Sequence, residues 1–165
     1  MRHIVTILLQ NEAGALGRVA GLFATRGYNI ESLNVAPTED GTVSRLTLVT
    51  TGSDEVIAQI NKQLAKLVDV VNIVDMTRGD HIERELALIK LRVADANVAT
   101  VKDVIASHGA RIIDDEADQF TAELTGGVTA VDDFIKAVKP HAEVLALVRT
   151  GVMAVARGQP VLTYR

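Results

Sequence analysis

The sequence repeats one order of strands and helices at a spacing of about 80 residues, although its two halves share few letters. In the first half, apolar residues at alternating positions and at spacings of three and four predict the order strand, helix, strand, strand, helix, strand. The second half follows the same order. We therefore predict an α+β chain of two tandem ferredoxin-like βαββαβ domains, each with both helices on one face of a four-stranded antiparallel sheet.

Turn and cap residues delimit the predicted elements. In the first half we expect helices around residues 16–23 and 57–67 and strands at 4–9, 28–36, 42–50 and 68–76. In the second half we expect helices around 98–105 and 131–138, a tail from Gly151, and strands at 85–93, 111–117, 120–124 and 143–149. A polar, glycine-containing stretch separates the halves. It predicts an N-terminal domain at 1–77, a linker at 78–81 and a C-terminal domain at 82–165.

Composition excludes several classes of protein. A net charge of −4 repels a phosphate backbone, so nucleic acid is not an expected partner. The chain has no cysteine, which excludes disulfides, thiolate nucleophiles and sulfur-ligated zinc and favours a cytoplasmic location. The apolar run at 4–9 is far shorter than the roughly 20 residues of a membrane span, so we expect no membrane contact and no targeting segment.

The sequence offers no group of residues suited to catalysis or to metal binding. Each serine lies in a predicted strand, at a helix cap or at a helix end, where a structural role is favoured over that of a nucleophile. His3, His81 and His141 are far apart, and the acidic residues at 114–118 lack the spacing of a calcium loop. We expect neither catalytic residues nor a metal site in this chain.

The loop between the first strand and the first helix is the best candidate for binding a small molecule. The N–H groups near Gly14, Ala15 and Leu16 lie at the positive end of the helix dipole, where a carboxylate can bind. Gly14 lets a ligand approach the main chain, and the amide of Asn11 can face an ammonium or a carboxylate. The alternative is a turn and helix cap with no ligand, which short Asn/Gly loops often form.

The second predicted strand, 28–36, lies at a sheet edge in this topology. It carries neither proline nor lysine to oppose pairing with another chain. Domains of about 75 residues bury comparatively little surface, and pairing with another sheet would cover the helix-free face. We therefore expect a homodimer that forms side by side through this strand.

Two segments, 11–19 and 21–38, closely resemble the opening of the small regulatory subunit of acetolactate synthase (acetohydroxyacid synthase). The most specific part is the stretch Arg26-Gly27-Tyr28-Asn29-Ile30-Glu31-Ser32-Leu33. The resemblance continues at 63–70, at 83–90 and in the tail Ala156-Arg157-Gly158, and it extends to the length and the two-part layout.

This resemblance implies that residues 1–77 form an ACT domain that binds a branched-chain amino acid, usually valine, at the interface of two ACT domains. The effector-binding residues that it implies are, on one chain, Asn11, Gly14, Ala15 and Leu16 and, on the other, Asn29 and Ile30. It also implies that the chain activates a large catalytic subunit and confers feedback inhibition in branched-chain amino acid biosynthesis. Catalysis then belongs to that subunit, with thiamine diphosphate, Mg and FAD, and this chain carries no cofactor.

Other functions remain open. An amino-acid-responsive regulator could act on another partner, although a transcription regulator needs a basic recognition helix, which neither half supplies. A free-standing enzyme on this fold would need a nucleophile and a base in a loop. The second half has no loop like 11–16, and the resemblance implies that it transmits the effector signal and supports contact with the catalytic subunit.

Overall fold

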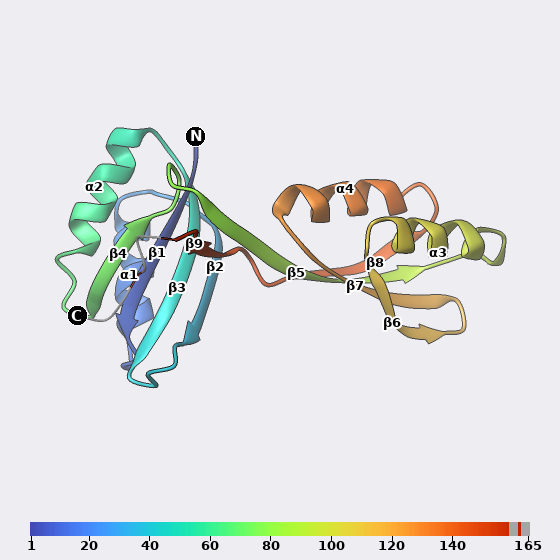
Figure 1. Ribbon diagram of the computed structural model, residues 1–165, viewed down its shortest axis with the longest axis horizontal. Helices are drawn as coiled ribbons and strands as arrows, with labels where there is room; N and C mark the ends of the chain where they lie inside the picture. Colours follow the sequence, from blue (N-terminus) through green and yellow to red (C-terminus); the bar gives the residue numbers. More distant parts are fainter. Residues whose placement is uncertain (159–161, 163–165) are drawn as a thin grey trace. The chain divides into compact units, whose positions relative to one another are not determined.

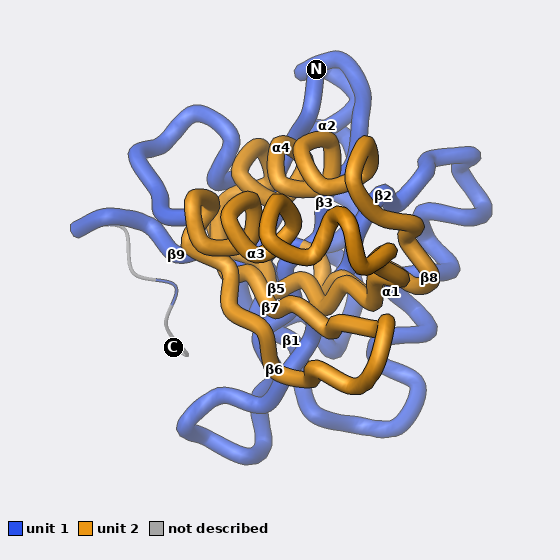
Figure 2. The backbone as a smooth tube through the Cα atoms, turned by 90° about the vertical axis from the view of Figure 1, so that its right-hand side faces the viewer, with its two compact units in different colours: residues 1–82, 152–165 blue, residues 83–151 orange. Residues whose placement is uncertain are grey.

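The computed structural model describes residues 1–158 and Leu162, and it divides the chain into two compact units (Figure 2). The first unit comprises residues 1–82 with the tail from Val152, and the second comprises residues 83–151. In each unit two helices cover one face of an antiparallel sheet (Figure 1). The predicted fold class is confirmed. Among the described residues, no helix has both the length and the apolar character needed to cross a bilayer.

The first unit has the strand order β2-β3-β1-β4. Its elements are β1 (Arg2–Gln10), α1 (Ala15–Thr25), β2 (Ile30–Pro37), β3 (Val43–Thr51), α2 (Asp54–Leu64) and β4 (Val70–Asp75). The central strands β1 and β3 pair without interruption, from Arg2 opposite Thr51 to Gln10 opposite Val43. This order leaves β2 and β4 as the two edges of the sheet, so the prediction of an edge position for the second strand is confirmed.

Side chains of β1 are buried on both faces of the sheet. Val5 and Ile7 belong to the core that α1 and α2 complete. Leu8, the next residue, packs instead with Val43 and with Leu162 of the tail. Because successive residues of a strand face opposite sides, Leu162 covers part of the helix-free face. The chain itself therefore covers some of the surface for which the sequence predicted a second sheet.

The second unit has the strand order β6-β7-β5-β8, and the tail carries a further short strand, β9 (Met153–Ala156). Its elements are β5 (His81–Arg92), a 3₁₀ turn at Asp95–Asn97, α3 (Val98–Ser107), β6 (Arg111–Glu116), β7 (Gln119–Gly126), α4 (Val128–Val138) and β8 (Glu143–Arg149). Its core joins Ile89 and Leu91 of β5 to Phe134 and Val138 of α4, all buried. Phe134 and Val138 are four residues apart and so lie on one apolar face of α4, which explains why this helix covers the sheet.

The boundaries of the compact units differ from the predicted ones. β5 begins at His81, inside the expected linker 78–81. The tail was expected within the C-terminal domain 82–165, whereas its part from Val152 belongs to the first unit. The reason is hydrophobic: Val152 is 3% exposed, and Leu162 packs on the first sheet. Proximity along the sequence therefore does not decide the unit to which the tail belongs.

Candidate functional site

Helix α1 begins without a side-chain cap. Gly14 occupies its N-cap position in the left-handed conformation, with φ of 85°, and the first turn contains no acidic residue. Helix α2 begins differently, because the side chain of Ser53 accepts a hydrogen bond from the backbone of Val56 and two acids follow in the first turn. This difference is expected if the positive end of the α1 dipole remains available to bind an external anion.

Some backbone amides at this helix start donate hydrogen bonds within the chain, and others have no partner in the helix. The amide of Ala15 donates to the carbonyl of Glu12 at 3.2 Å, so it is not the free donor that the sequence predicts. The amide of Arg18 donates to the carbonyl of Gly14 at 3.0 Å and closes the first helical turn. Helical geometry gives the amides of Leu16 and Gly17 no partner within the helix. These two amides are therefore the first-turn donors best suited to a carboxylate.

A guanidinium group lies beside this helix start. The side chain of Arg18 comes so close to Gly14 that a Cβ at position 14 would lie 3.1 Å from its Nη1 atom. Two hydrogen bonds to Asp69 hold it, Nε to Oδ2 at 2.5 Å and Nη2 to Oδ1 at 2.8 Å. Their main effect is to lower the pKa of Asp69 and to raise the pKa of Arg18. A fixed positive charge thus adds to the helix dipole at Gly14.

Neither Arg18 nor Asp69 is among the residues predicted for the site. The spacing from Gly14 to Arg18 is four, which on a helix places two residues on one face, and this signal could have identified Arg18. Asp69 is 51 residues from Arg18 in the sequence and directly precedes β4, so no local pattern connects it to the loop. The arginine remains 47% exposed while the aspartate side chain is 6% exposed.

Asn11 is anchored from both its backbone and its side chain. Its backbone amide donates to the carbonyl of Thr42 at 2.8 Å, and its Nδ2 donates to the carbonyl of Gly41 at 2.9 Å. This second contact uses a donor of the side-chain amide, whereas the Oδ1 atom can only accept. The geometry therefore favours an ammonium, rather than a carboxylate, as the ligand group at Asn11.

A hollow of about 240 Å³ joins this loop to the edge strand β2. Asn11, Ala15 and Leu16 line it together with Val35 and Pro37 of β2. Leu16 and Val35 are each 38% exposed, so two aliphatic side chains remain accessible there. The hollow combines an apolar lining with the polar groups of the loop, as binding sites for small molecules usually do.

The structure does not bring Asn29 and Ile30 to this hollow within one chain. Ile30 opens β2, whereas Val35 lies five residues further along the strand. At about 3.3 Å per residue this separation is about 17 Å. Asn29 is exposed, and its backbone carbonyl accepts a hydrogen bond from Oγ1 of Thr50 at 2.6 Å. A site that used all six predicted residues would have to draw them from two chains.

Asp115 and Ser107, which belong to groups considered from the sequence for metal binding and catalysis, each have a partner of their own in the second unit. Within residues 1–158 and at Leu162, no group of three His, Asp or Glu side chains is close enough to hold a metal ion. The acids of β6 lie at the surface, where Asp115 pairs with Lys102 at 3.4 Å. The hydroxyl of Ser107 donates to the carbonyl of Val104 at the end of α3, a structural role.

Each half of the chain matches the profile of a known protein family. A profile of the AHAS small subunit-like ACT domain matches residues 5–72, and a profile of the small subunit of acetolactate synthase matches residues 84–158. The small subunit of acetolactate synthase isozyme 3 from Escherichia coli K12 is 42% identical over 162 residues, which cover 98% of this chain and 99% of that protein. The acetolactate synthase small subunit from Haemophilus influenzae is 43% identical over 96% of this chain and 98% of that protein.

A solved structure has the same architecture. The crystal structure of the acetolactate synthase small subunit from Thermotoga maritima superposes with a TM-score of 0.87 at 34% identity, covering 97% of this chain and 99% of that one. Similarity in sequence and in structure thus extends over nearly the full length of each chain. On these grounds the chain belongs to the family of acetolactate synthase small subunits, the regulatory subunits of that enzyme.

Proposed function

We propose that this chain binds valine at an interface between two ACT domains, and that it activates the catalytic subunit of an acetolactate synthase and makes it subject to feedback inhibition. The observation that carries the proposal is the uncapped start of α1 at Gly14, with the guanidinium of Arg18 beside it and an edge strand next to it. Such a site suits the carboxylate of an amino acid.

Each part of valine has a counterpart in this region. The first-turn amides at Leu16 and Gly17, with Arg18, provide donors and positive charge for the carboxylate. Oδ1 of Asn11 can accept a hydrogen bond from the ammonium. The isopropyl group would contact Leu16 and Val35, the exposed aliphatic side chains of the hollow. One methylene in an apolar pocket changes binding by about 1 to 3 kcal/mol, so leucine and isoleucine should bind more weakly rather than not at all.

A dimer formed through β2 would bring Asn29 and Ile30 of one chain to the site of the other. β2 is an edge strand, and its last three residues are exposed. Two copies related by a two-fold axis would pair their β2 strands antiparallel, so that the start of one strand lies beside the end of the other. Asn29 and Ile30 of one chain would then reach the hollow that the other chain forms at Val35 and Pro37.

Valine binding at such an interface can regulate a second polypeptide. Ordering of the two β2 edges by the ligand would change the surface that the dimer presents, and coupling free energies of about 1 to 3 kcal/mol give five- to 150-fold regulation. Under this proposal the catalytic subunit carries the thiamine diphosphate, Mg and FAD, and this chain contributes the effector site. Binding is reciprocal, so the catalytic subunit must change the affinity for valine by the same factor.

The proposal is tested by mixing the purified chain with its catalytic subunit and measuring acetolactate formation with and without valine. We expect the chain to raise the activity and valine to reverse the increase. Asn11→Ala and Asn29→Ala should each weaken inhibition, whereas Gln59→Ala, an exposed amide on α2, should not. Activation with no valine response in the unchanged protein would contradict the effector site while leaving the family assignment intact.

A further inference from the structure

A second cavity of the first unit lies at the opposite end of β1 from the loop at Gly14. It has a volume of about 360 Å³ and lies between α2 and the turn that follows β4. Asp54, Ala58 and Asn61 line it from one face of α2, because spacings of three and four bring residues together on a helix. The remaining lining residues are His3, Ile57, Asp75 and Arg78.

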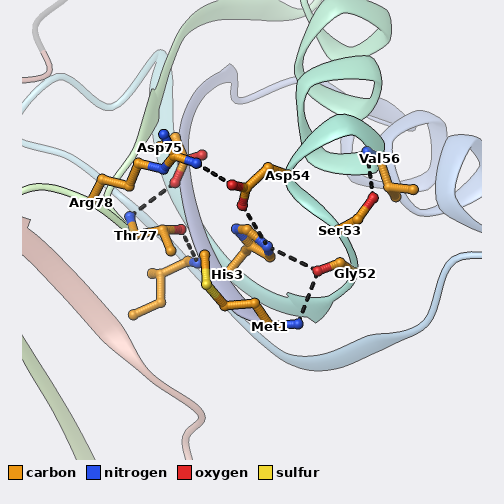
Figure 3. Close-up of polar contacts among 10 residues, drawn as sticks. Met1, His3, Gly52, Ser53, Asp54, Val56, Asp75, Thr77 and Arg78 are labelled. Carbon is orange, nitrogen blue, oxygen red and sulfur yellow. Dashed lines mark hydrogen bonds and ion pairs between the residues drawn. The ribbon is translucent and has the colours of Figure 1, made fainter.

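Two buried hydrogen-bond acceptors in the residues that line this cavity have no partner. They are Nδ1 of His3 and Oδ1 of Asn61, and the His3 side chain is only 2% exposed. The other ring nitrogen, Nε2, lies 3.1 Å from the carbonyl of Gly52, on the opposite side of the ring from Nδ1 (Figure 3). A carbonyl can only accept, so Nε2 carries the hydrogen and Nδ1 of the neutral ring is an acceptor. Buried polar groups are normally paired, so the two unpartnered acceptors point to a ligand that donates.

The charges around the cavity favour a cation. Asp54 and Asp75 supply two carboxylates, and Arg78 supplies one guanidinium that pairs with Asp54 (Figure 3). Oδ1 of Asp75 accepts a hydrogen bond from the backbone amide of Thr77 at 2.9 Å, which leaves Oδ2 for a further contact. The lining thus has two carboxylates for one guanidinium, and Oδ1 of Asp54 also lies 3.8 Å from Nε2 of His3 (Figure 3).

We propose that this cavity binds the primary ammonium group of a small aliphatic amine. Nδ1 of His3 and Oδ1 of Asn61 accept hydrogen bonds from the ammonium, and the carboxylate of Asp75 balances its charge. Ile57 and Ala58 provide the apolar contact for the alkyl chain. A metal ion fits this position poorly, because the described residues include no cluster of three His, Asp or Glu ligands.

This amine site is separate from the proposed valine site. His3 and Gln10 lie near opposite ends of β1, about 23 Å apart at about 3.3 Å per residue. The hollow at the loop and the cavity at His3 share no lining residue. Occupancy of one site can therefore be measured with the other empty, and failure of either proposal leaves the other standing.

The test is a titration of the full-length, ¹⁵N-labelled protein with n-butylammonium chloride, followed by nuclear magnetic resonance. We expect saturable shifts of the backbone amides of His3, Asp54 and Asn61. Tetramethylammonium chloride, a cation without an N–H donor, serves as the ligand control and should give no saturable shifts. Asn61→Ala should weaken n-butylammonium binding about tenfold, the equivalent of about one hydrogen bond, while Gln59→Ala on the exposed face of α2 should leave it unchanged.

Asp75→Asn is the second variant, because it removes the charge but keeps an oxygen that can accept from Thr77. It should also weaken binding of n-butylammonium, and unchanged melting temperatures would show that both variants remain folded. The proposal is overturned if n-butylammonium gives no saturable shifts, if tetramethylammonium binds equally well, or if either folded variant keeps the original affinity.

Discussion

Arg18 lies against Gly14 at the start of α1, with its guanidinium held by two hydrogen bonds to the nearly buried carboxylate of Asp69. Arg18 is on α1, whereas Asp69 lies just before β4, so the contact ties the helix to an edge of the sheet. A cation beside the positive, N-terminal end of a helix is unfavourable unless an anion compensates it. Asp69 supplies one anion, and an effector carboxylate would supply another.

Gly14→Asp should abolish valine inhibition while it leaves activation of the catalytic subunit intact. The new carboxylate would stand where the ligand carboxylate binds and would pair with Arg18, whose Nη1 lies 3.1 Å from the position of the added Cβ. The measurement is acetolactate formation by the reconstituted enzyme over a range of valine concentrations.

The matched control for this variant is Gly127→Asp. Gly127 is also an N-cap glycine, at α4 of the second unit, but its φ is −70° and an added Cβ would have open space. An aspartate there should cap α4 and leave valine inhibition unchanged. Retained inhibition in Gly14→Asp, or its equal loss in Gly127→Asp, would count against the site at α1.

Asp69→Asn should destabilise the first unit at neutral pH. The hydrogen bonds from Arg18 lower the pKa of Asp69 in the folded chain below its ordinary value of 3.8, so ionised Asp69 stabilises the fold above that value. This stabilisation is lost as the pH falls through the lowered pKa. Urea midpoints of the two proteins should therefore differ at neutral pH and converge in strong acid, and a difference that persisted there would show that lost charge is not the cause.

Arg149→Met should destabilise the second unit by about 3 kcal/mol, because it leaves a buried carboxylate without its partner. The side chain of Glu85 is 2% exposed and forms two hydrogen bonds with Arg149, which also contacts Asp132 at 2.8 Å. Chemical denaturation followed by circular dichroism measures the loss. As a control, Arg111→Met breaks an exposed ion pair with Glu123 and should cost less than about 1 kcal/mol.

Leu162→Ala should destabilise the first unit by about 2 kcal/mol, since it removes the side chain that packs on Leu8 and Val43. Val155→Ala, in the same tail but 52% exposed, is the control and should change the free energy of unfolding little. Equal effects of the two substitutions on urea denaturation would show that the tail does not cover the sheet.

Local patterns in the sequence were sufficient to predict the fold of each half. Alternation along β1 and the three-and-four spacing on α1 and α2 are signals within single elements, and they indicate which faces are buried. Local patterns do not show that the tail joins the first compact unit, because the burial of Val152 and Leu162 depends on a surface that only the folded first sheet provides.

The candidate site was only partly predictable for the same reason. The loop at Asn11 and Gly14 is a local feature that the sequence indicates, whereas the left-handed conformation of Gly14, with φ of 85°, is seen only in the structure. The pairing of Arg18 with Asp69 spans 51 residues and has no local signature. Whether Asn29 completes the site depends on a second chain, which is why that role stays a prediction.

A site shared by two chains makes a sharp prediction for mixed dimers. If Asn11 of one chain and Asn29 of the other bind the same valine, dimers of Asn11→Ala with Asn29→Ala contain one intact site and one that lacks both residues. Homodimers of either variant contain no intact site.

The most direct test is therefore calorimetric titration of valine into mixed dimers, purified through a different affinity tag on each variant. The proposed interface predicts half the stoichiometry of the unchanged protein with its full affinity. Absence of binding in the mixed dimer, with binding in the unchanged protein, would show that both asparagines act within one chain and would contradict a valine site formed between two chains.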